Sequence, residues 1–444
     1  MKLINAFMYS ILLILSACGG AESNNLNSSN FSSSSSSSSN SSLNGPIQSA
    51  NSSSSSSSSV ANATILQKYL NTTGTNVVPV TINGSSCGTA GNDNANTPCV
   101  SVTLCEPGTN NCQTINNILL DTGSFGLRIF KSLLTISPPA LKNSAGQIYA
   151  ECATFGIGAD WGSLASLDVS LNSSEKASSV PVQIIDDTFS NYASACQLGA
   201  VDTDPTNAGF NGILGIGGFQ SDCGDYCVST AQNQIYYACD GISNCTESAI
   251  PLKLQVSNPI YGFSNDNNGV ILAFPDISST GAKDLSGVLI LGIGTRTNNT
   301  PSSSDNFTTF PADANTGYIS TNYNNYSFSA LFDTGTNGFV FSDNSITQCT
   351  GNLSGFFCPG TELFLSTQIT SSVNQETKTL FFNINDTNIL ANTGNSVFND
   401  IGYAQSSSSS DLFILGIPAY MNRVIVIGYD GKSSPLGNGV SFSF

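Results

Sequence analysis

The chain of 444 residues contains no histidine. This absence excludes Ser-His-Asp and Cys-His catalysis, and it removes the commonest zinc ligand. Acid–base chemistry would therefore depend on carboxylate, tyrosine, lysine or cysteine side chains. We expect neither a metal site nor a cofactor.

Positive charge is also scarce. The sequence has 12 Lys and Arg residues against 29 Asp and Glu, which gives a net charge of −17. A charge of this sign argues against binding to nucleic acid and against attraction to anionic lipids. The hydrophobic content of 39% is sufficient for a large core, and the length indicates more than one structural unit.

Long apolar runs are missing as well. The N-terminus has one positive residue and then an apolar stretch near residues 11–15, which is too short for a permanent membrane span. We interpret residues 1–17 as a signal peptide. The segment LSAC resembles the bacterial lipobox, so Cys18 is the predicted lipidation site; a plain secretory signal with an incidental cysteine is the alternative. Gly19 favours the outer membrane, and the predicted location is the bacterial cell envelope, at its periplasmic face or on the cell surface.

Residues 18–60 consist mostly of Ser and Asn, and we predict that they form a disordered tether behind the lipidated cysteine. Beyond residue 60, short runs of Val, Ile, Phe and Thr alternate with turn residues, and helical periodicity is nearly absent. The predicted fold is mainly β, with at most a few short helices. The candidate strands are VPVTI (78–82), VSVTL (100–104), VPVQII (180–185), GVILAF (269–274), GVLILGI (287–293), TLFFNI (379–384) and RVIVIGY (423–429).

Cysteines are numerous for a chain with a predicted export signal. Thirteen cysteines minus Cys18 leave twelve, which allows up to six disulfides in an oxidising compartment. Short spacings predict local pairs between Cys105 and Cys112, Cys223 and Cys227, Cys239 and Cys245, and Cys349 and Cys358. Metal binding is the alternative for Cys223 and Cys227, although no second paired set with zinc-like spacing accompanies them.

The sequence contains a long-period repeat around two aspartates. LLDTGSFGLRIF (119–130), at the end of a predicted hairpin, returns as ALFDTGTNGFVF (330–341). Each copy is followed by a second shared segment, NGILGIG (211–217) or LFILGIP (412–418). A glycine after two apolar residues is expected where a backbone passes close to another strand. The chain therefore carries one Asp-Thr-Gly motif in each of two related units.

In their order, these motifs resemble those of pepsin-type bilobal aspartic proteases. The resemblance extends over roughly residues 64–444, and it implies two related β-lobes with a cleft between them, which we place at residues 64–265 and 266–444. The predicted signal and the segments LLDTGSFGLRIF and ADWGS also resemble a bacterial family of unknown function, DUF3443. For that family, the fold and the activity implied here are themselves inferences.

The resemblance implies a catalytic dyad of Asp121 and Asp333. Two carboxyl groups at hydrogen-bonding distance share one proton, because ionising both carries a large electrostatic cost. The ionised member can take a proton from water that attacks a peptide carbonyl, while the protonated member donates to the carbonyl oxygen. The residues that would join the two loops and donate to the carboxylates are Thr122, Gly123, Ser124, Thr334, Gly335 and Thr336.

The predicted flap departs from the family pattern. In these proteases a hairpin with a Tyr before Gly-x-Gly closes over the substrate, and the matching residues here are Phe155 and Gly156, so the hydroxyl is missing. We expect Phe155 and Trp161 either to cover the cleft or to pack within the fold. Arg128 stands where the family commonly has an aromatic residue. We expect it to be exposed, with a pairing to Asp160 or a role in binding acidic substrates as alternatives.

These features predict an envelope-anchored aspartic endopeptidase that acts on polypeptide as a monomer. The alternative is a catalytically inactive pepsin-fold protein that binds a peptide, a glycan or a protein in the envelope. A surface adhesin, in which the Ser/Asn tether is the functional part, is a third interpretation. The expected contact with the membrane is the N-terminal lipid, and no nucleic-acid partner is expected.

Overall fold

The computed structural model describes residues 63–83, 95–156, 158–171, 175–190, 196, 200–241, 244–371, 373–405 and 412–444. The predicted signal peptide, Cys18 and the predicted tether lie outside the described residues. In the described part the chain is mainly β, as predicted. None of its helices is long and apolar enough to cross a membrane.

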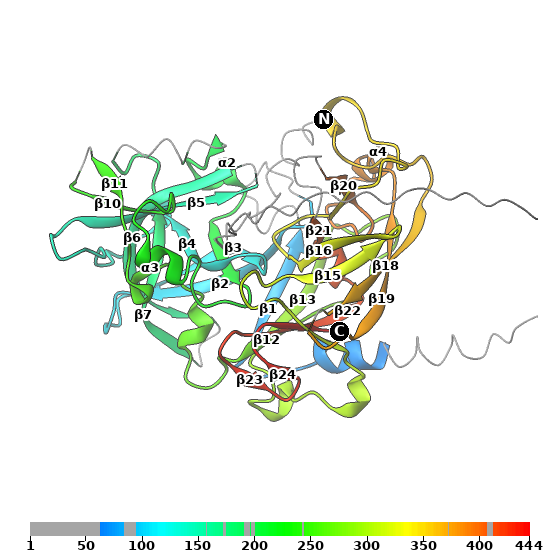
Figure 1. Cartoon of the computed structure of the whole chain (residues 1–444), viewed down its shortest axis with the longest axis horizontal. Coiled ribbons are helices and arrows are strands. Elements are labelled where there is room, and N and C mark those ends of the chain that lie inside the picture. Colours follow the sequence, from blue (N-terminus) through cyan, green and yellow to red (C-terminus); the bar gives the residue numbers. More distant parts are fainter. Residues whose placement is uncertain are drawn as a thin grey trace, which may run out of the picture.

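Two β-rich lobes lie side by side. Most strands of the first half are cyan and green on the left of Figure 1, and most strands of the second half are yellow to red on the right. The boundary that we place near residue 265 remains a prediction. All seven candidate strands are strands in the structure, which confirms the β pattern of the sequence.

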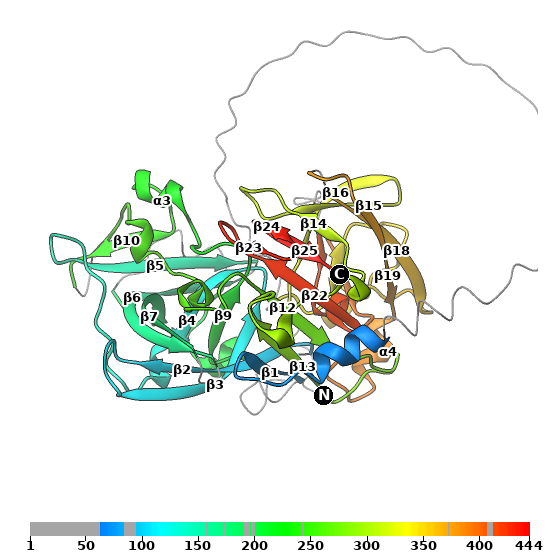
Figure 2. The same cartoon turned by 90° about the horizontal axis from the view of Figure 1, so that it is seen from below.

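A 16-stranded sheet contains the first lobe and continues into the second half of the chain. In order across the sheet, its strands are β11 (Cys245–Glu247), β10 (Tyr236–Cys239), β5 (Ile148–Phe155), β6 (Gly158–Ser170), β7 (Lys176–Ile185), β4 (Phe125–Phe130), β9 (Gly212–Ile216), β3 (Cys112–Asp121), β2 (Pro98–Cys105), β1 (Val77–Asn83), β13 (Asp284–Leu291), β12 (Gly269–Phe274), β22 (Arg423–Gly428), β25 (Ser441–Ser443) and β14 (Thr309–Pro311), with β8 (Ala200–Val201) paired to β6. Figure 2 shows β1, β13, β12 and β22 between the two lobes. The halves of the chain are thus joined by continuous strand pairing.

The second lobe has a 7-stranded sheet of its own. Its strands, in order, are β19 (Thr377–Ile384), β18 (Leu363–Thr370), β15 (Ile319–Tyr323), β16 (Tyr326–Phe332), β21 (Leu412–Leu415), β17 (Phe339–Phe341) and β20 (Gly402–Ala404). A separate hairpin joins β23 (Ser433–Ser434) to β24 (Gly437–Asn438). Phenylalanine rings pack together in the core of this lobe. The ring centroid of Phe341 lies 4.9 Å from that of Phe413 and 5.0 Å from that of Phe357.

Helices are short in the described part of the chain. Residues 63–70 are helical, and the other helices are α2 (Pro205–Ala208), α3 (Asp225–Ser229), α4 (Thr387–Ala391) and the 3-10 turns η1 (Lys131–Leu133), η3 (Leu252–Leu254), η4 (Pro259–Gly262), η5 (Thr297–Asn299), η6 (Ser303–Asp305), η7 (Gly351–Leu353) and η9 (Ile417–Tyr420). Turn residues interrupt the apolar runs, so no segment keeps a helical pattern long enough to form a long helix.

The strand β3 delivers the first aspartate into the core. Its sequence CQTINNILLD starts with mostly exposed residues and ends with four buried ones. The Cys105–Cys112 disulfide joins β3 to β2 at its start, since these two cysteines lie opposite each other. Asp121 therefore sits at the buried end of a braced strand.

Candidate active site

Each Asp-Thr-Gly motif begins at the end of a central strand. β3 ends at Asp121 and runs parallel to β9, with Asp121 opposite Gly215. β16 ends at Phe332 and runs parallel to β21, and the backbone N–H of Asp333 donates to the carbonyl of Leu415 at 3.0 Å. The strand after each motif, β4 or β17, runs antiparallel to the same neighbour. The two halves thus build one unit twice, around one aspartate each.

The glycine of each Ile-Leu-Gly segment lies where two backbones nearly touch. A Cβ on Gly215 would lie 2.6 Å from the backbone nitrogen of Phe125. A Cβ on Gly416 would lie 2.1 Å from the carbonyl oxygen of Gly338. Any larger residue would therefore force the strand away from the loop that carries the aspartate.

Two threonines join the aspartate loops by reciprocal hydrogen bonds. The N–H of Thr334 donates to the hydroxyl of Thr122 at 2.9 Å, and the N–H of Thr122 donates to the hydroxyl of Thr334 at 3.1 Å. The Thr122 hydroxyl donates to the carbonyl of Phe332 at 3.0 Å, and the Thr334 hydroxyl to that of Leu120 at 2.7 Å. Both side chains are buried. Because the loops are 212 residues apart in sequence, these bonds fix the two halves against each other.

Tyr420, which the sequence analysis missed, completes this arrangement. It is fully buried at the end of η9, and its hydroxyl lies 2.8 Å from the hydroxyl of Thr122. Since Thr122 has only one hydroxyl proton and directs it to Phe332, Tyr420 is the donor. Burial raises the pKa of Tyr420 well above its usual value, so it keeps its proton. An aromatic residue four positions after the glycine in both copies, Phe219 in the first, is the signal that could have identified it.

The carboxylate of Asp121 accepts hydrogen bonds from its own loop. The N–H of Gly123 donates at 2.8 Å, and the hydroxyl of Ser124 donates to the other oxygen. Asp121 is 4% exposed and Ser124 is 1% exposed, so the group is almost completely withdrawn from solvent. These donors hold the carboxylate in one orientation.

Asp333 has the matching environment in the second loop. The N–H of Gly335 donates to it at 2.8 Å, and the hydroxyl of Thr336 donates at 2.5 Å. Burial raises the pKa of Asp333 well above its usual range, and the charge of Asp121 and a hydrogen bond to it raise the pKa further. The pair therefore keeps one proton under conditions in which an isolated carboxyl group would have lost it.

The two carboxyl groups cross over toward the opposite loop. A Cβ on Gly123 would lie 2.6 Å from the carboxyl carbon of Asp333, and a Cβ on Gly335 would lie 2.6 Å from Oδ1 of Asp121. Only glycine leaves this space open for a carboxyl group. The structure thus brings together Asp121, Asp333 and the supporting residues of both motifs.

The predicted flap is the hairpin of β5 and β6. Phe155 lies opposite Gly158 near its tip, where Gly156 is exposed. Phe155 is half-buried, and its ring centroid lies 5.6 Å from the guanidinium of Arg128. The two positions that differ from the family pattern therefore contact each other, as a cation–π pair.

The expectation that Trp161 covers the cleft is wrong. Its side chain is fully buried and packs against Cys152 and Tyr237, with the Tyr237 ring 5.4 Å away. The indole N–H donates to the carbonyl of Phe189 at 2.6 Å. Trp161 is thus part of the packing beneath the hairpin.

The expectation that Arg128 is exposed is also wrong, because it is only 2% exposed. Its ion pairs go to Glu151 at 2.7 Å and Asp222 at 3.0 Å, and not to Asp160. Burial opposes the charge of Arg128, but Glu151 and Asp222 raise its pKa above the usual value. Burial also raises the pKa of Glu151, and Asp222 adds to this while Arg128 opposes it. With both acidic neighbours already bonded to Arg128, its side chain belongs to the fold and does not offer a charge to acidic substrates.

Disulfides support the loops of both halves. The four predicted local pairs are present, and Cys223–Cys227 is therefore a disulfide and not a metal site. Cys152 and Cys196, 44 residues apart, form a further pair that the spacing did not predict. Cys99 is also disulfide-bonded.

The fold can now be assigned from this geometry. Two related β-units, each with an Asp-Thr-Gly loop between a parallel strand pair, meet with their carboxyl groups crossed and their threonines reciprocally bonded. This is the bilobal fold of the pepsin-like aspartic proteases.

Comparisons with known proteins found a matching family model and similar solved structures. The crystal structure of an aspartic proteinase from Irpex lacteus is similar over 83% of this chain and 96% of that chain, with 15% sequence identity and a TM-score of 0.46. No curated protein matches the chain. The family model described as "Protein of unknown function (DUF3443)" matches residues 72–444, and the chain belongs to this family.

Proposed function

We propose that this protein is an aspartic endopeptidase in which Asp121 and Asp333 activate water against a peptide bond. The observation that carries the proposal is the buried pair of crossed carboxyl groups, held by equivalent donors and by the two threonines.

The chemistry follows from the shared proton. Asp333 keeps the proton and donates it to the carbonyl oxygen of the substrate, while Asp121 accepts a proton from the attacking water. The bonds from Gly123 and Ser124 stabilise the ionised Asp121. When the C–N bond of the tetrahedral intermediate breaks, the proton now on Asp121 passes to the leaving amine, and Asp333 takes back the proton of the former carbonyl oxygen as the C=O bond re-forms. Both carboxyl groups thus return to their starting states.

One observation favours a second candidate, a catalytically inactive protein that binds a peptide in the same cleft. Phe155 has no hydroxyl to offer a substrate, and its ring is engaged with Arg128. The flap would then serve binding without assisting hydrolysis. The intact set of donors around both carboxylates supports the enzyme.

We propose further that the protein is anchored in the bacterial cell envelope by a lipid on Cys18, in the outer membrane, and that it acts there as a monomer on polypeptide. The support is the lipobox-like segment and the Ser/Asn-rich residues 18–60. Metabolic labelling with a fatty-acid analogue tests the anchor. Label that persists in Cys18→Ser would contradict it.

The test of the activity is the digestion of a denatured, disulfide-free protein by the purified full chain between about pH 3 and pH 7. We expect peptides to appear in mild acid with the wild type and not with Asp121→Asn, which keeps the shape of the side chain and removes the charge. Asp240→Asn is the matched control, since Asp240 is exposed just after β10, at the far edge of the sheet. Cleavage that survives in Asp121→Asn would contradict the proposal, and binding without cleavage would favour the second candidate.

A further inference from the structure

A large cavity is lined by residues of both halves of the chain, and it includes Phe125, which follows the first aspartate loop. Its volume is about 1100 Å³. From the first half it is lined by Phe125 and residues 219–226, and from the second half by residues 313–316 and 318–320. Phe125 directly follows the Ser124 that bonds to Asp121. The cavity is thus placed to hold substrate residues beside the bond to be cleaved.

The position of Tyr318 supports this placement. Tyr318 lines the cavity directly before Ile319, which pairs with Ala330 on β16, the strand that leads to Asp333. From the second half, the cavity therefore lies beside the strand that carries this aspartate. Phe125, on the other side, connects the same cavity to Asp121.

Aromatic rings and carboxylates dominate the chemistry of the lining. Phe125 and Phe219 meet edge to face with their centroids 5.4 Å apart. Four aspartates also line the cavity, and no Lys or Arg stands among the lining residues in the described part of the chain. The aspartates are Asp222, Asp225, Asp313 and Asp430.

Three of these carboxylates form no ion pair within the part of the chain that the structure describes. Asp222 is bonded to Arg128, but Asp225, Asp313 and Asp430 are exposed and take part in none of the ion pairs of the described residues. The N–H groups of Thr316 and Asn315 lower the pKa of Asp313, so it stays ionised in mild acid, where the aspartate pair would work. A cavity of this kind attracts positive charge.

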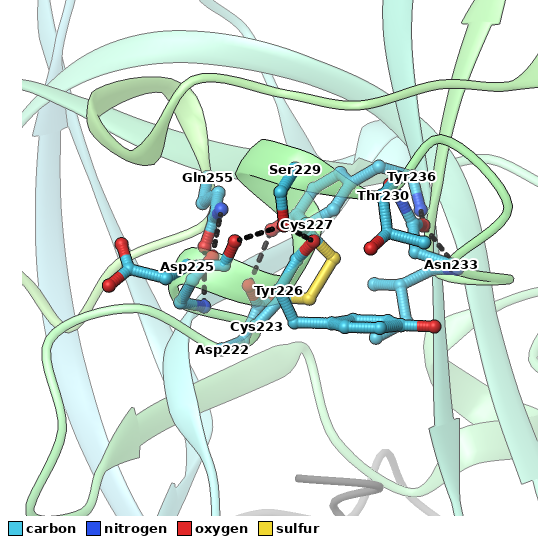
Figure 3. The surroundings of a disulfide bond; sticks show 12 residues. Asp222, Cys223, Asp225, Tyr226, Cys227, Ser229, Thr230, Asn233, Tyr236 and Gln255 are labelled. Carbon is cyan, nitrogen blue, oxygen red and sulfur yellow. Dashed lines mark hydrogen bonds between the residues drawn. A yellow bond between two sulfur atoms is a disulfide. The ribbon is translucent and has the colours of Figure 1, made fainter. Parts of the chain in front are cut away.

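The wall that carries Asp225 is braced. Figure 3 shows the Cys223–Cys227 disulfide beneath it and Asp225 with its carboxylate directed away from the disulfide. Gln255 bonds to both backbone groups of Gly224, accepting at 2.8 Å and donating at 2.8 Å. The N-terminal end of the loop is held by the bonds of Asp222 to Arg128 and Tyr236. The loop presents Asp225 from a fixed position, which a specificity site requires.

We propose that this cavity binds a lysine or arginine side chain of the peptide, so that the protein prefers cationic substrates. The inference rests on the proposed function and adds the substrate class to it. The aliphatic stem of the side chain would lie against the rings of Phe125 and Phe219, and its charge would face Asp225, Asp313 and Asp430. Acidic peptides would be repelled by the same three groups.

The first test compares cleavage of matched peptides by the purified full chain. The peptides differ at one position, which carries Lys, Gln or Glu and is moved step by step along both sides of the cleaved bond. At one of these positions we expect kcat/KM to be about tenfold higher for Lys than for Gln, the scale of several exposed carboxylates acting together, and to decrease with added salt. The triple variant Asp225→Asn/Asp313→Asn/Asp430→Asn should bring the Lys-to-Gln ratio close to one, whereas Asp240→Asn should preserve it. Equal rates for the three peptides at every position would overturn the inference and leave the proposed function intact.

The second test measures binding without turnover. Fluorescently labelled Lys and Glu peptides are titrated with Asp121→Asn, and with the same variant carrying the triple substitution. We expect tighter binding of the Lys peptide, and loss of that difference in the combined variant. This result without cleavage by the wild type would support the cationic site and reject the endopeptidase. Equal binding of both peptides by Asp121→Asn would reject the cationic site.

Discussion

The hydroxyl of Thr334 gives the sharpest test of how the aspartate loops are held. Thr334→Val keeps the shape and the branching of the side chain and removes only the hydroxyl. The N–H of Thr122 and the carbonyl of Leu120 then lose the partners that they have at 3.1 and 2.7 Å. Both groups lie in a buried site, and each unsatisfied group costs ~1–3 kcal/mol. With two such groups, the free energy of unfolding should therefore fall by ~2–6 kcal/mol.

Urea unfolding of the purified full chain measures this change, and Thr114→Val is the matched control. Thr114 lies on the same strand, β3, and its hydroxyl is 2.8 Å from that of Thr103 on the exposed side of the hairpin. Loss of this exposed bond should change the free energy of unfolding by no more than ~0.5 kcal/mol. If Thr334→Val were as stable as Thr114→Val, the threonine hydrogen bonds would not be what holds the two aspartate loops together.

Three further predictions concern stability. Arg128→Met should lower the free energy of unfolding by ~3–5 kcal/mol, because it leaves buried acids without their cation. Adding Glu151→Gln should restore part of this loss. If Arg128→Met unfolded with the same free energy as the wild type, the buried ion pair would be refuted. Gly416→Ala should cost ~1–3 kcal/mol, because its Cβ would lie 2.1 Å from a backbone oxygen, and wild-type thermal stability would contradict that close approach. Burial raises the pKa values of Asp202 and Asp400 to about 6, so the folded state holds these protons more tightly than the unfolded state. Their contribution to stability is present below the ordinary aspartate pKa of about 4 and is lost as the pH rises through about 6. The free energy of unfolding in urea should therefore fall between these pH values, and it should fall less in Asp202→Asn and in Asp400→Asn. A free energy of unfolding that rises over this range would count against this account.

The parts of the site that could be predicted from the sequence are those that short, repeated segments encode. The two Asp-Thr-Gly motifs and the two Ile-Leu-Gly segments specify a strand, a sharp loop and a close backbone approach within a few residues each. Asp121 and Asp333 lie together because both copies fold in the same way. The short-range disulfides could be predicted for the same reason, because each one joins neighbouring arms of a single loop.

Contacts between distant segments could not be read in this way. Arg128 meets Glu151, 23 residues away, and Asp222, 94 residues away, and no local pattern indicates either partner. An arginine in a loop-rich acidic chain is expected at the surface, and Arg128 is buried because the fold brings Glu151 and Asp222 to its guanidinium. Trp161 was misjudged for a related reason. Alternation along β6 does not say which face of the hairpin will be covered by β10 and the Cys152–Cys196 disulfide.

The central claim is that Asp121 and Asp333 act as one catalytic unit, and the most direct test is the cleavage rate of a single defined peptide by both single variants and the double variant. We expect Asp121→Asn and Asp333→Asn each to lose a factor of about 10³ or more, and the double variant to lose no more than either one, because residues that act as a unit are not additive. If either single variant retained cleavage, or if the two losses multiplied in the double variant, the shared-proton pair would be contradicted.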